Sequence, residues 1–229
     1  MNGKIIVFEG IDGSGKGTQS KELYEYLQNL NYKVILLEFP FYNETFFGKE
    51  VGEYLNGVFG QLDEVHPKFS AMLYAGDRFE KKETILKKLN DGYMIICDRY
   101  VPSNIAHQTA KYQNESERKK LKQWIEELEY NVYGLPKPNI VLFMDMNPNL
   151  SDKLVLKKDI RNYTNKQKDL HESDNTYLVN VYKIFKQMTK NTNWFNIECQ
   201  DSNNGLKSIQ TIQSEIINKL TKNNILEPI

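Results

Sequence analysis

Short apolar runs alternate along this chain with longer segments in which apolar residues recur at helical spacing. The runs predict buried strands over residues 4–9, 33–39, 93–97, 139–144 and 195–197. The longer segments predict helices over residues 18–30, 67–90, 103–111, 115–129 and 209–220. Because strands that alternate with helices favour a parallel sheet covered on both faces, we expect a three-layer α/β fold with about five parallel strands. Ligands of such sheets bind beyond the carboxyl ends of the strands.

Apolar stripes indicate which faces of the predicted helices are buried. One face of the first helix carries Leu23, Leu27 and Leu30. The stripe of the long second helix consists of Phe69, Met72, Leu73, Phe79 and Leu86. Tyr74 and Arg78 lie four residues apart and share a different face of that helix. Asp77 and Lys81 have the same spacing, and we expect them to form a solvated pair.

Composition and charge narrow the class of protein. The 229 residues, 40% hydrophobic and 26% charged, fit one globular domain over residues 1–229. The 30 Lys and Arg residues equal the 30 Asp and Glu residues, which excludes the overall positive charge of a general nucleic-acid binder. No apolar run approaches the ~20 residues that span a membrane, and the first run is too short for a signal peptide. Cys97 and Cys199 lie in apolar runs without metal-ligand spacing. We therefore expect buried free thiols and a cytoplasmic location.

A glycine-rich segment follows the first predicted strand and opens the first helix. It consists of Gly10, Ile11, Asp12, Gly13, Ser14, Gly15, Lys16, Gly17 and Thr18. Its glycines let successive amides turn toward phosphate oxygens, the helix adds the positive end of its dipole, and Lys16 adds a charge for the outer phosphates. This segment predicts a site for a nucleoside triphosphate.

The position after Lys16 departs from the general form of this loop. A Ser or Thr hydroxyl usually binds Mg²⁺ there, whereas this chain has Gly17 followed by Thr18, a form that resembles the loop of adenylate kinases. Thr18 is therefore the candidate hydroxyl. A GTPase would need a base-reading Asn-Lys-x-Asp segment, and Asn165-Lys166-Gln167-Lys168 lacks the final acid. The loop by itself does not choose among the other nucleotide-binding classes.

Polar residues also follow the second and third predicted strands, at the edge that should carry the loop. Asp98 is placed to hold a Mg²⁺-bound water, and Arg99 offers a two-pronged donor for a phosphate monoester. The alternative is a structural ion pair between these two residues. Tyr74 and Arg78 could stack on a nucleobase and donate to its carbonyl, or they could form an ordinary helix surface. Ser103 is expected to cap the next helix, which brings Asn104, His107 and Gln108 near the same edge.

Taken together, these motifs resemble the thymidylate kinase family of P-loop nucleoside monophosphate kinases. The matching residues are 8–16, 39–40, 73–78, 98–100 with Ser103 and 106–108, and 136–139. They follow the family's order over most of residues 4–145, and residues 169–182 resemble the segment after the family's lid. The resemblance implies that ATP is the donor, dTMP the acceptor and Mg²⁺ the metal, and it suggests a homodimer formed through apolar helix faces.

The resemblance also implies roles for individual residues around dTMP. Asp12 would contact the 3′-hydroxyl or the metal shell, and Phe39 and Pro40, joined by a cis bond, would line the pocket. Tyr74 would stack on thymine, and Arg78 would reach its O4 atom. In the same way Arg99 would hold the acceptor phosphate beside Ser103. Asn104 would lie near the base, and His107 would stand near the 2′ position of the sugar, where relatives usually have Tyr.

Catalytic groups are likewise assigned by resemblance. With Gly13 in the loop rather than Arg, the chain resembles the subgroup whose catalytic cations come from the lid, here about residues 151–170 with Lys157, Lys158 and Arg161. The expected catalytic set is Lys16, Arg99, Asp12, Asp98, Lys158 and Arg161. The metal would be held by Asp98, Thr18 and Glu9, partly through water. Two alternatives stay open: another pyrimidine nucleotide or nucleoside kinase, and a nucleotide-binding regulatory protein without turnover.

Overall fold

Five parallel strands form one sheet in the order β2-β3-β1-β4-β5. In chain order the strands are β1 (Lys4–Glu9), β2 (Val34–Glu38), β3 (Met94–Asp98), β4 (Ile140–Asp145) and β5 (Trp194–Glu198). The computed structural model describes residues 3–155, 170–171, 174–203 and 205–227. All five predicted strands are confirmed, with ends that differ by a few residues. Phe8 and Glu38 both pair with Asp98, so the three strands end at one edge.

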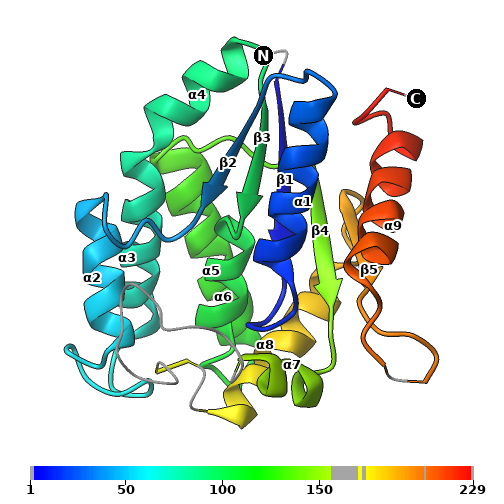
Figure 1. Ribbon diagram of the computed structural model, residues 1–229. Helices are drawn as coiled ribbons and strands as arrows, with labels where there is room; N and C mark the ends of the chain where they lie inside the picture. Colours follow the sequence, from blue (N-terminus) through cyan, green and yellow to red (C-terminus); the bar gives the residue numbers. More distant parts are fainter. Residues whose placement is uncertain (1–2, 156–169, 172–173, 204, 228–229) are drawn as a thin grey trace.

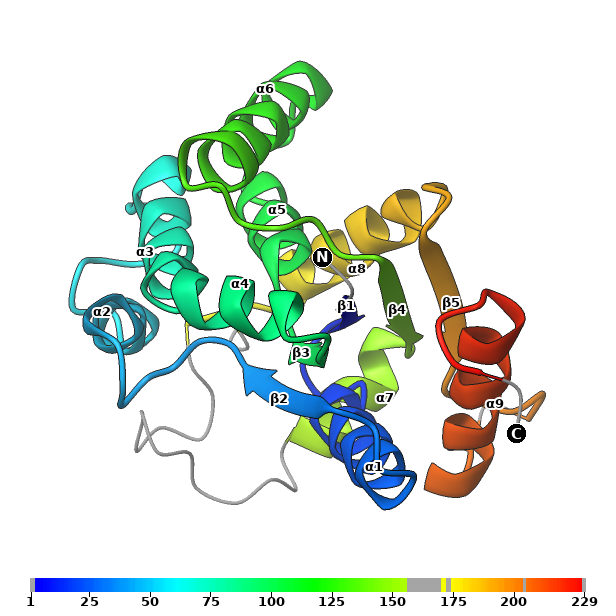
Figure 2. The same cartoon turned by 90° about the horizontal axis from the view of Figure 1, so that it is seen from above.

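Helices cover both faces of this sheet, as the sequence predicted (Figures 1 and 2). One face packs against α1 (Lys16–Asn29) and α9 (Ile209–Lys222). The other packs against α4 (Lys82–Asn90), α5 (Val101–Thr109), α6 (Glu115–Glu126) and α8 (Asn175–Met188). Alternate residues of the strands supply the two cores, because successive side chains point to opposite faces: Ile5 and Val7 belong to one core, Ile6 and Phe8 to the other.

The sequence pattern missed several boundaries. The single helix predicted over residues 67–90 is divided at Lys81 into α3 (Pro67–Glu80) and α4, and α6 continues into a π-helix, η1 (Glu127–Val132). Three helices were not predicted: α2 (Phe46–Leu55), α7 (Pro148–Val155) and α8. In α2 two glycines lower the helix propensity, and the cap hydrogen bond from the Gly48 amide to the Thr45 side chain starts the helix.

The predicted stripe of the long helix is wrong for most of its members. Phe69, Met72 and Phe79 are 42%, 40% and 46% exposed, and only Leu73 of the α3 members is buried. Small residues let α3 approach its neighbours instead. A Cβ on Gly76 would come within 2.5 Å of the Phe47 ring of α2. The buried side of α3 therefore consists mainly of Ser70, Ala71, Leu73, Ala75, Gly76, Asp77 and Arg78.

Two other predictions of which side chains are buried also fail, one for Asp77 and one for Leu30. Asp77 does not form a solvated pair with Lys81: it is fully buried and accepts hydrogen bonds from the Phe41 amide and the Thr45 hydroxyl. A buried carboxylate needs such donors, and here they tie the chain after β2 to α3. Leu30 is 40% exposed because it lies at the C-cap, after the last turn of α1.

The cysteine prediction is confirmed: Cys97 and Cys199 are free and buried. Burial raises the pKa of the Cys97 thiol, which keeps it protonated. Among the described residues, no helix has the length and apolar character needed to cross a membrane.

Candidate functional site

The glycine-rich loop lies between β1 and α1, at the carboxyl edge of the sheet (Figure 1). Gly10, Gly13 and Gly15 have φ angles of 149°, 80° and 89°, in the region that glycine adopts without steric cost. A Cβ on Gly13 would also come within 2.4 Å of the Ser151 carbonyl oxygen. Lys16 is 5% exposed, and its Nζ donates to a carbonyl oxygen of the loop at 2.9 Å. The loop is thus closely packed around its own lysine.

The N-cap of α1 is Gly15, and no side chain caps this helix. Side chains cap α2, α3, α6, α8 and α9, whereas α4 and α5 also lack a side-chain cap. In α1 the first amides follow a glycine-rich loop, which suits them to bind an anion, as in phosphate sites at helix N-termini. The cavity beside them, here called the loop cavity, is lined by Asp12, Gly13, Gly15, Lys16, Gly17, Thr18, Lys21, Glu38, Asp98 and Arg99.

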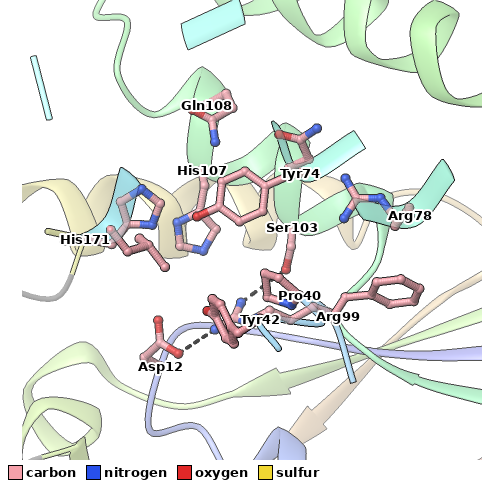
Figure 3. A pocket seen from close by; sticks show the side chains of 13 residues that line it. Asp12, Pro40, Tyr42, Tyr74, Arg78, Arg99, Ser103, His107, Gln108 and His171 are labelled. Carbon is pink, nitrogen blue, oxygen red and sulfur yellow. Dashed lines mark hydrogen bonds and ion pairs between the residues drawn. The ribbon is translucent and has the colours of Figure 1, made fainter. Parts of the chain in front are cut away.

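A second cavity, here called the inner cavity, lies next to the loop. Its walls come from the chain after β2, from α2, α3 and α5, and from His171. The lining residues are Asp12, Phe39, Pro40, Tyr42, Leu55, Tyr74, Arg78, Arg99, Ser103, Asn104, His107, Gln108 and His171 (Figure 3). The bond between Phe39 and Pro40 is cis, as the sequence comparison with the family implied.

Arg99 stands at the junction of the two cavities and lines both, as does Asp12. Its Nη2 donates to Asp12 Oδ1 at 2.6 Å, and its Nη1 donates to the Gly10 carbonyl and to Ser103 Oγ (Figure 3). Arg99 has a φ of 64°, which a non-glycine residue adopts at a cost of about 1 kcal/mol or more. The alternative interpretation, a structural ion pair between Asp98 and Arg99, is not what the structure shows, because the guanidinium pairs with Asp12 instead.

Glu9 supports Arg99 from beneath. Its carboxylate is fully buried and accepts from the amides of Tyr100 and Ser103 and from Ser103 Oγ, which in turn accepts from Arg99. Burial raises the pKa of Glu9 to about 7, although these donors oppose the shift. Ser103 lies inside α5, whose N-cap is Tyr100, and no side chain caps this helix. The prediction that Ser103 caps the helix is therefore wrong. Ser103 positions the guanidinium instead.

The far wall of the inner cavity holds the aromatic and amide groups. Tyr74 of α3 faces His107 of α5 and His171, and the two histidine rings stack with centroids 5.0 Å apart (Figure 3). Burial lowers the pKa of His107 to about 3, so this ring stays neutral at physiological pH. Tyr54 Oη lies 3.2 Å from His171 Nε2 and accepts from Lys111 Nζ at 2.9 Å. Burial lowers the pKa of Lys111 to about 7.

Arg78 and Asn104 reach the same wall from opposite helices. Arg78 donates through Nε and Nη2 to the carboxylate of Glu129, at 2.6 and 2.7 Å, and both side chains are buried. The Asn104 amide nitrogen donates to the same carboxylate and to the Ala71 carbonyl. Its Oδ1 is buried without a partner among the described residues. An unpartnered acceptor at a cavity wall is the expected mark of a ligand contact.

The residues proposed for a metal fit one only in part. Asp98 Oδ1 is buried without a partner in the described part of the chain, and Asp98 and Thr18 both line the loop cavity. A Cβ on Gly17 would lie 3.1 Å from Asp98 Oδ2, so glycine leaves this carboxylate room. Glu9 does not fit, because its oxygens are already engaged beneath Ser103. Within the described residues, no group of three or more His, Cys, Asp or Glu side chains is placed to hold a metal ion.

The structure gathers most of the predicted site residues and adds others. Phe39, Pro40, Tyr74, Arg78, Arg99, Ser103, Asn104, His107 and Asp12 all line the inner cavity. Sequence reasoning did not assign Tyr42, Leu55 or His171 to it. Gln108 was expected near the same edge from its position on the predicted helix, but without a role. His171 lies in a segment that was matched to the family by resemblance alone. The lid cations Lys157, Lys158 and Arg161 lie outside the described residues.

Comparisons with known proteins agree with this geometry. A family model for thymidylate kinase matches residues 8–216. Thymidylate kinase of Plasmodium falciparum is 30% identical over 221 residues, which cover 96% of this chain and 90% of that protein. The enzyme of Rickettsia typhi is 32% identical over 82% of this chain and 83% of its own. A solved structure of thymidylate kinase from Candida albicans, 24% identical, covers 97% of this chain and 93% of its own with a TM-score of 0.72, which supports the fold.

Proposed function

The chain belongs to the thymidylate kinase family, and we propose that it transfers the γ-phosphoryl group of ATP to dTMP, giving dTDP and ADP, through the residues of its two cavities. One observation supports placing ATP in the loop cavity and dTMP in the inner cavity. Among the described residues, Asp12 and Arg99 line both cavities, so a donor in the loop cavity and an acceptor in the inner cavity would meet beside them. Such a transfer needs positioning and charge neutralisation more than covalent help from the protein.

The acceptor is already a phosphate anion, so it needs no strong general base. Arg99 would hold this phosphate, because its guanidinium is partly exposed at the junction and anchored by Asp12 and Ser103. Lys16 and the uncapped amides of α1 would hold the phosphates of ATP. Lys158 and Arg161 of the lid remain proposed partners for the transferred group. Closure of a lid would exclude water and so suppress hydrolysis of ATP.

The inner cavity would take the nucleoside of dTMP. Tyr74 offers a ring for stacking, and Arg78 and Asn104 offer polar groups to the edge of the base. His107, uncharged at neutral pH, would lie beside the sugar. Mg²⁺ bound with ATP would neutralise charge on the phosphates, and Asp98 and Thr18 are the residues that would hold it, directly or through water.

A coupled assay for ADP release tests this function. Purified protein with ATP and Mg²⁺ should release ADP upon addition of dTMP, with one dTDP formed for each ADP. A nucleotide-binding regulatory protein would bind ATP without this release. A panel of other pyrimidine nucleosides and monophosphates tests the second alternative. Preference for an acceptor other than dTMP would overturn the proposal.

We also propose that the protein forms a homodimer through α3. Phe69, Met72 and Phe79 share one exposed face of this helix, and Val132 is 66% exposed. The regular spacing that suggested a core stripe is expected if a second copy covers the face. The cytoplasm stays the proposed location, in line with the free thiols of Cys97 and Cys199.

A further inference from the structure

We propose that Glu129 sets the hydrogen-bonding polarity of the inner cavity and thereby lets the protein distinguish a thymine edge from a cytosine edge. Glu129 does not line the cavity. It is fully buried in the π-helix η1, and it contacts the two polar residues that do line the base end. It is therefore a positioning residue. The inference rests on the proposed function, because it concerns the acceptor base of the same reaction.

The first step concerns the amide of Asn104. One side of this amide faces the Ala71 carbonyl at 3.0 Å and the Glu129 carboxylate at 2.8 Å. Both neighbours are acceptors only, so the nitrogen of the amide must face them. The oxygen is then left on the other side, buried and without a partner among the described residues. Because Asn104 lines the inner cavity, Glu129 would fix this amide as the acceptor that is available to a ligand there.

The second step concerns Arg78. Glu129 accepts from its Nε and its Nη2, which holds the guanidinium plane in one orientation. Nη1 makes no hydrogen bond to any of the described residues, and the side chain lines the cavity. Arg78 can only donate. The same carboxylate therefore presents one fixed donor and one fixed acceptor at the base end of the cavity.

This pair matches only one kind of pyrimidine edge. Thymine offers a carbonyl oxygen at position 4 and an N–H donor at position 3, which complement Arg78 and Asn104. Cytosine offers an amino group and an unprotonated nitrogen, so both contacts would be reversed. A site that hydrogen-bonds a substrate strongly rejects an analogue that leaves its buried groups unpaired.

The test compares dTMP with 5-methyl-dCMP, which differs from dTMP only at positions 3 and 4 of the ring. In the Glu129→Gln variant a side-chain amide replaces the carboxylate, so at least one donor must face Arg78 or Asn104. We expect the ratio of kcat/KM for dTMP to that for 5-methyl-dCMP to fall at least tenfold. The change should appear mainly in KM, with kcat for dTMP within a few-fold of wild type, because Arg99 is not altered.

Glu126→Gln is the matched control, since Glu126 lies three residues away, is 40% exposed and does not line the inner cavity. It should leave the ratio unchanged.

A Glu129→Gln protein that is less stable to heat but keeps the wild-type ratio would show a merely structural role and overturn the inference. If that variant does not fold, Glu129→Asp takes its place, because a shorter carboxylate cannot hold both partners. A wild-type protein without turnover of dTMP would instead overturn the proposed function.

Discussion

The role of Arg99 can be tested most directly by Arg99→Ala. The wild-type guanidinium is held by Asp12, the Gly10 carbonyl and Ser103, at the junction of both cavities. It would donate up to two charge-assisted hydrogen bonds to the acceptor phosphate, each with a net contribution of about 1.5–3 kcal/mol. Loss of both raises the barrier by roughly 3–6 kcal/mol, which corresponds to a fall of about 10²–10⁴ in kcat/KM for dTMP.

The substitution should leave the fold in place. The side chain is partly exposed, and alanine can adopt the backbone of residue 99 no less readily than arginine, because both carry a Cβ. The freed Asp12 carboxylate adds repulsion toward the phosphate. The double variant Arg99→Ala with Asp12→Asn separates that repulsion from the loss of donors. Arg99→Lys keeps the charge without the two-pronged geometry and should recover only part of the rate.

The coupled ADP assay with increasing dTMP measures these effects, and equilibrium binding of ATP checks that the loop is intact. Arg118→Ala is the matched control, since Arg118 contacts the Tyr112 carbonyl on the surface and lines neither cavity. It should have wild-type kinetics. If Arg99→Ala turned over dTMP within a few-fold of wild type, the phosphate would be held elsewhere and the assignment of the junction would be refuted.

Three further predictions concern the loop, the buried carboxylate and the exposed helix face. Lys16→Ala should lower kcat by roughly 10²-fold or more, because an unneutralised phosphate charge remains in the transition state; a change below threefold would contradict this. Glu9 binds its proton more tightly in the folded protein than when unfolded, with a pKa of about 7 against 4.5, so stability should fall by roughly 3 kcal/mol as pH rises through that interval. Urea unfolding of Glu9→Gln should lack that part of the pH dependence, and an unchanged slope would refute it. Met72→Glu should convert a dimer to a monomer in analytical ultracentrifugation, and a wild-type protein that is already monomeric would contradict the dimer.

The sequence predicted those parts of the molecule whose structure depends on residues that are close together in the chain. The strands, the loop and Arg99 followed from short apolar runs and from the residues next to their ends, because parallel strands share a carboxyl edge. The partner of Arg78 could not be found in this way. Glu129 lies 51 residues further along the chain, and only the packing of η1 against α3 and α5 brings it within 2.6 Å.

The same limit explains two other misses. His171 stacks on His107 although 64 positions separate them, and neither residue carries a local signal for that contact. The regular spacing of Phe69, Met72 and Phe79 has another cause. Apolar periodicity reports that a helix face avoids water, without saying whether the same chain or a second copy covers it.

At this edge of the sheet, buried side chains whose hydrogen bonds are all satisfied differ from buried side chains that keep an unpartnered oxygen. We expect the first kind to position their neighbours and the second kind to bind a ligand. Glu9 and Glu129 are fully buried, and their oxygens already accept from neighbours. Asp98 Oδ1, at the loop cavity, and Asn104 Oδ1, at the inner cavity, are buried without a partner among the described residues. Each such group costs the fold about 1–3 kcal/mol unless something satisfies it. Their position beside the two cavities is explained if nucleotides supply the missing contacts, so that binding and folding stability are coupled through the same atoms.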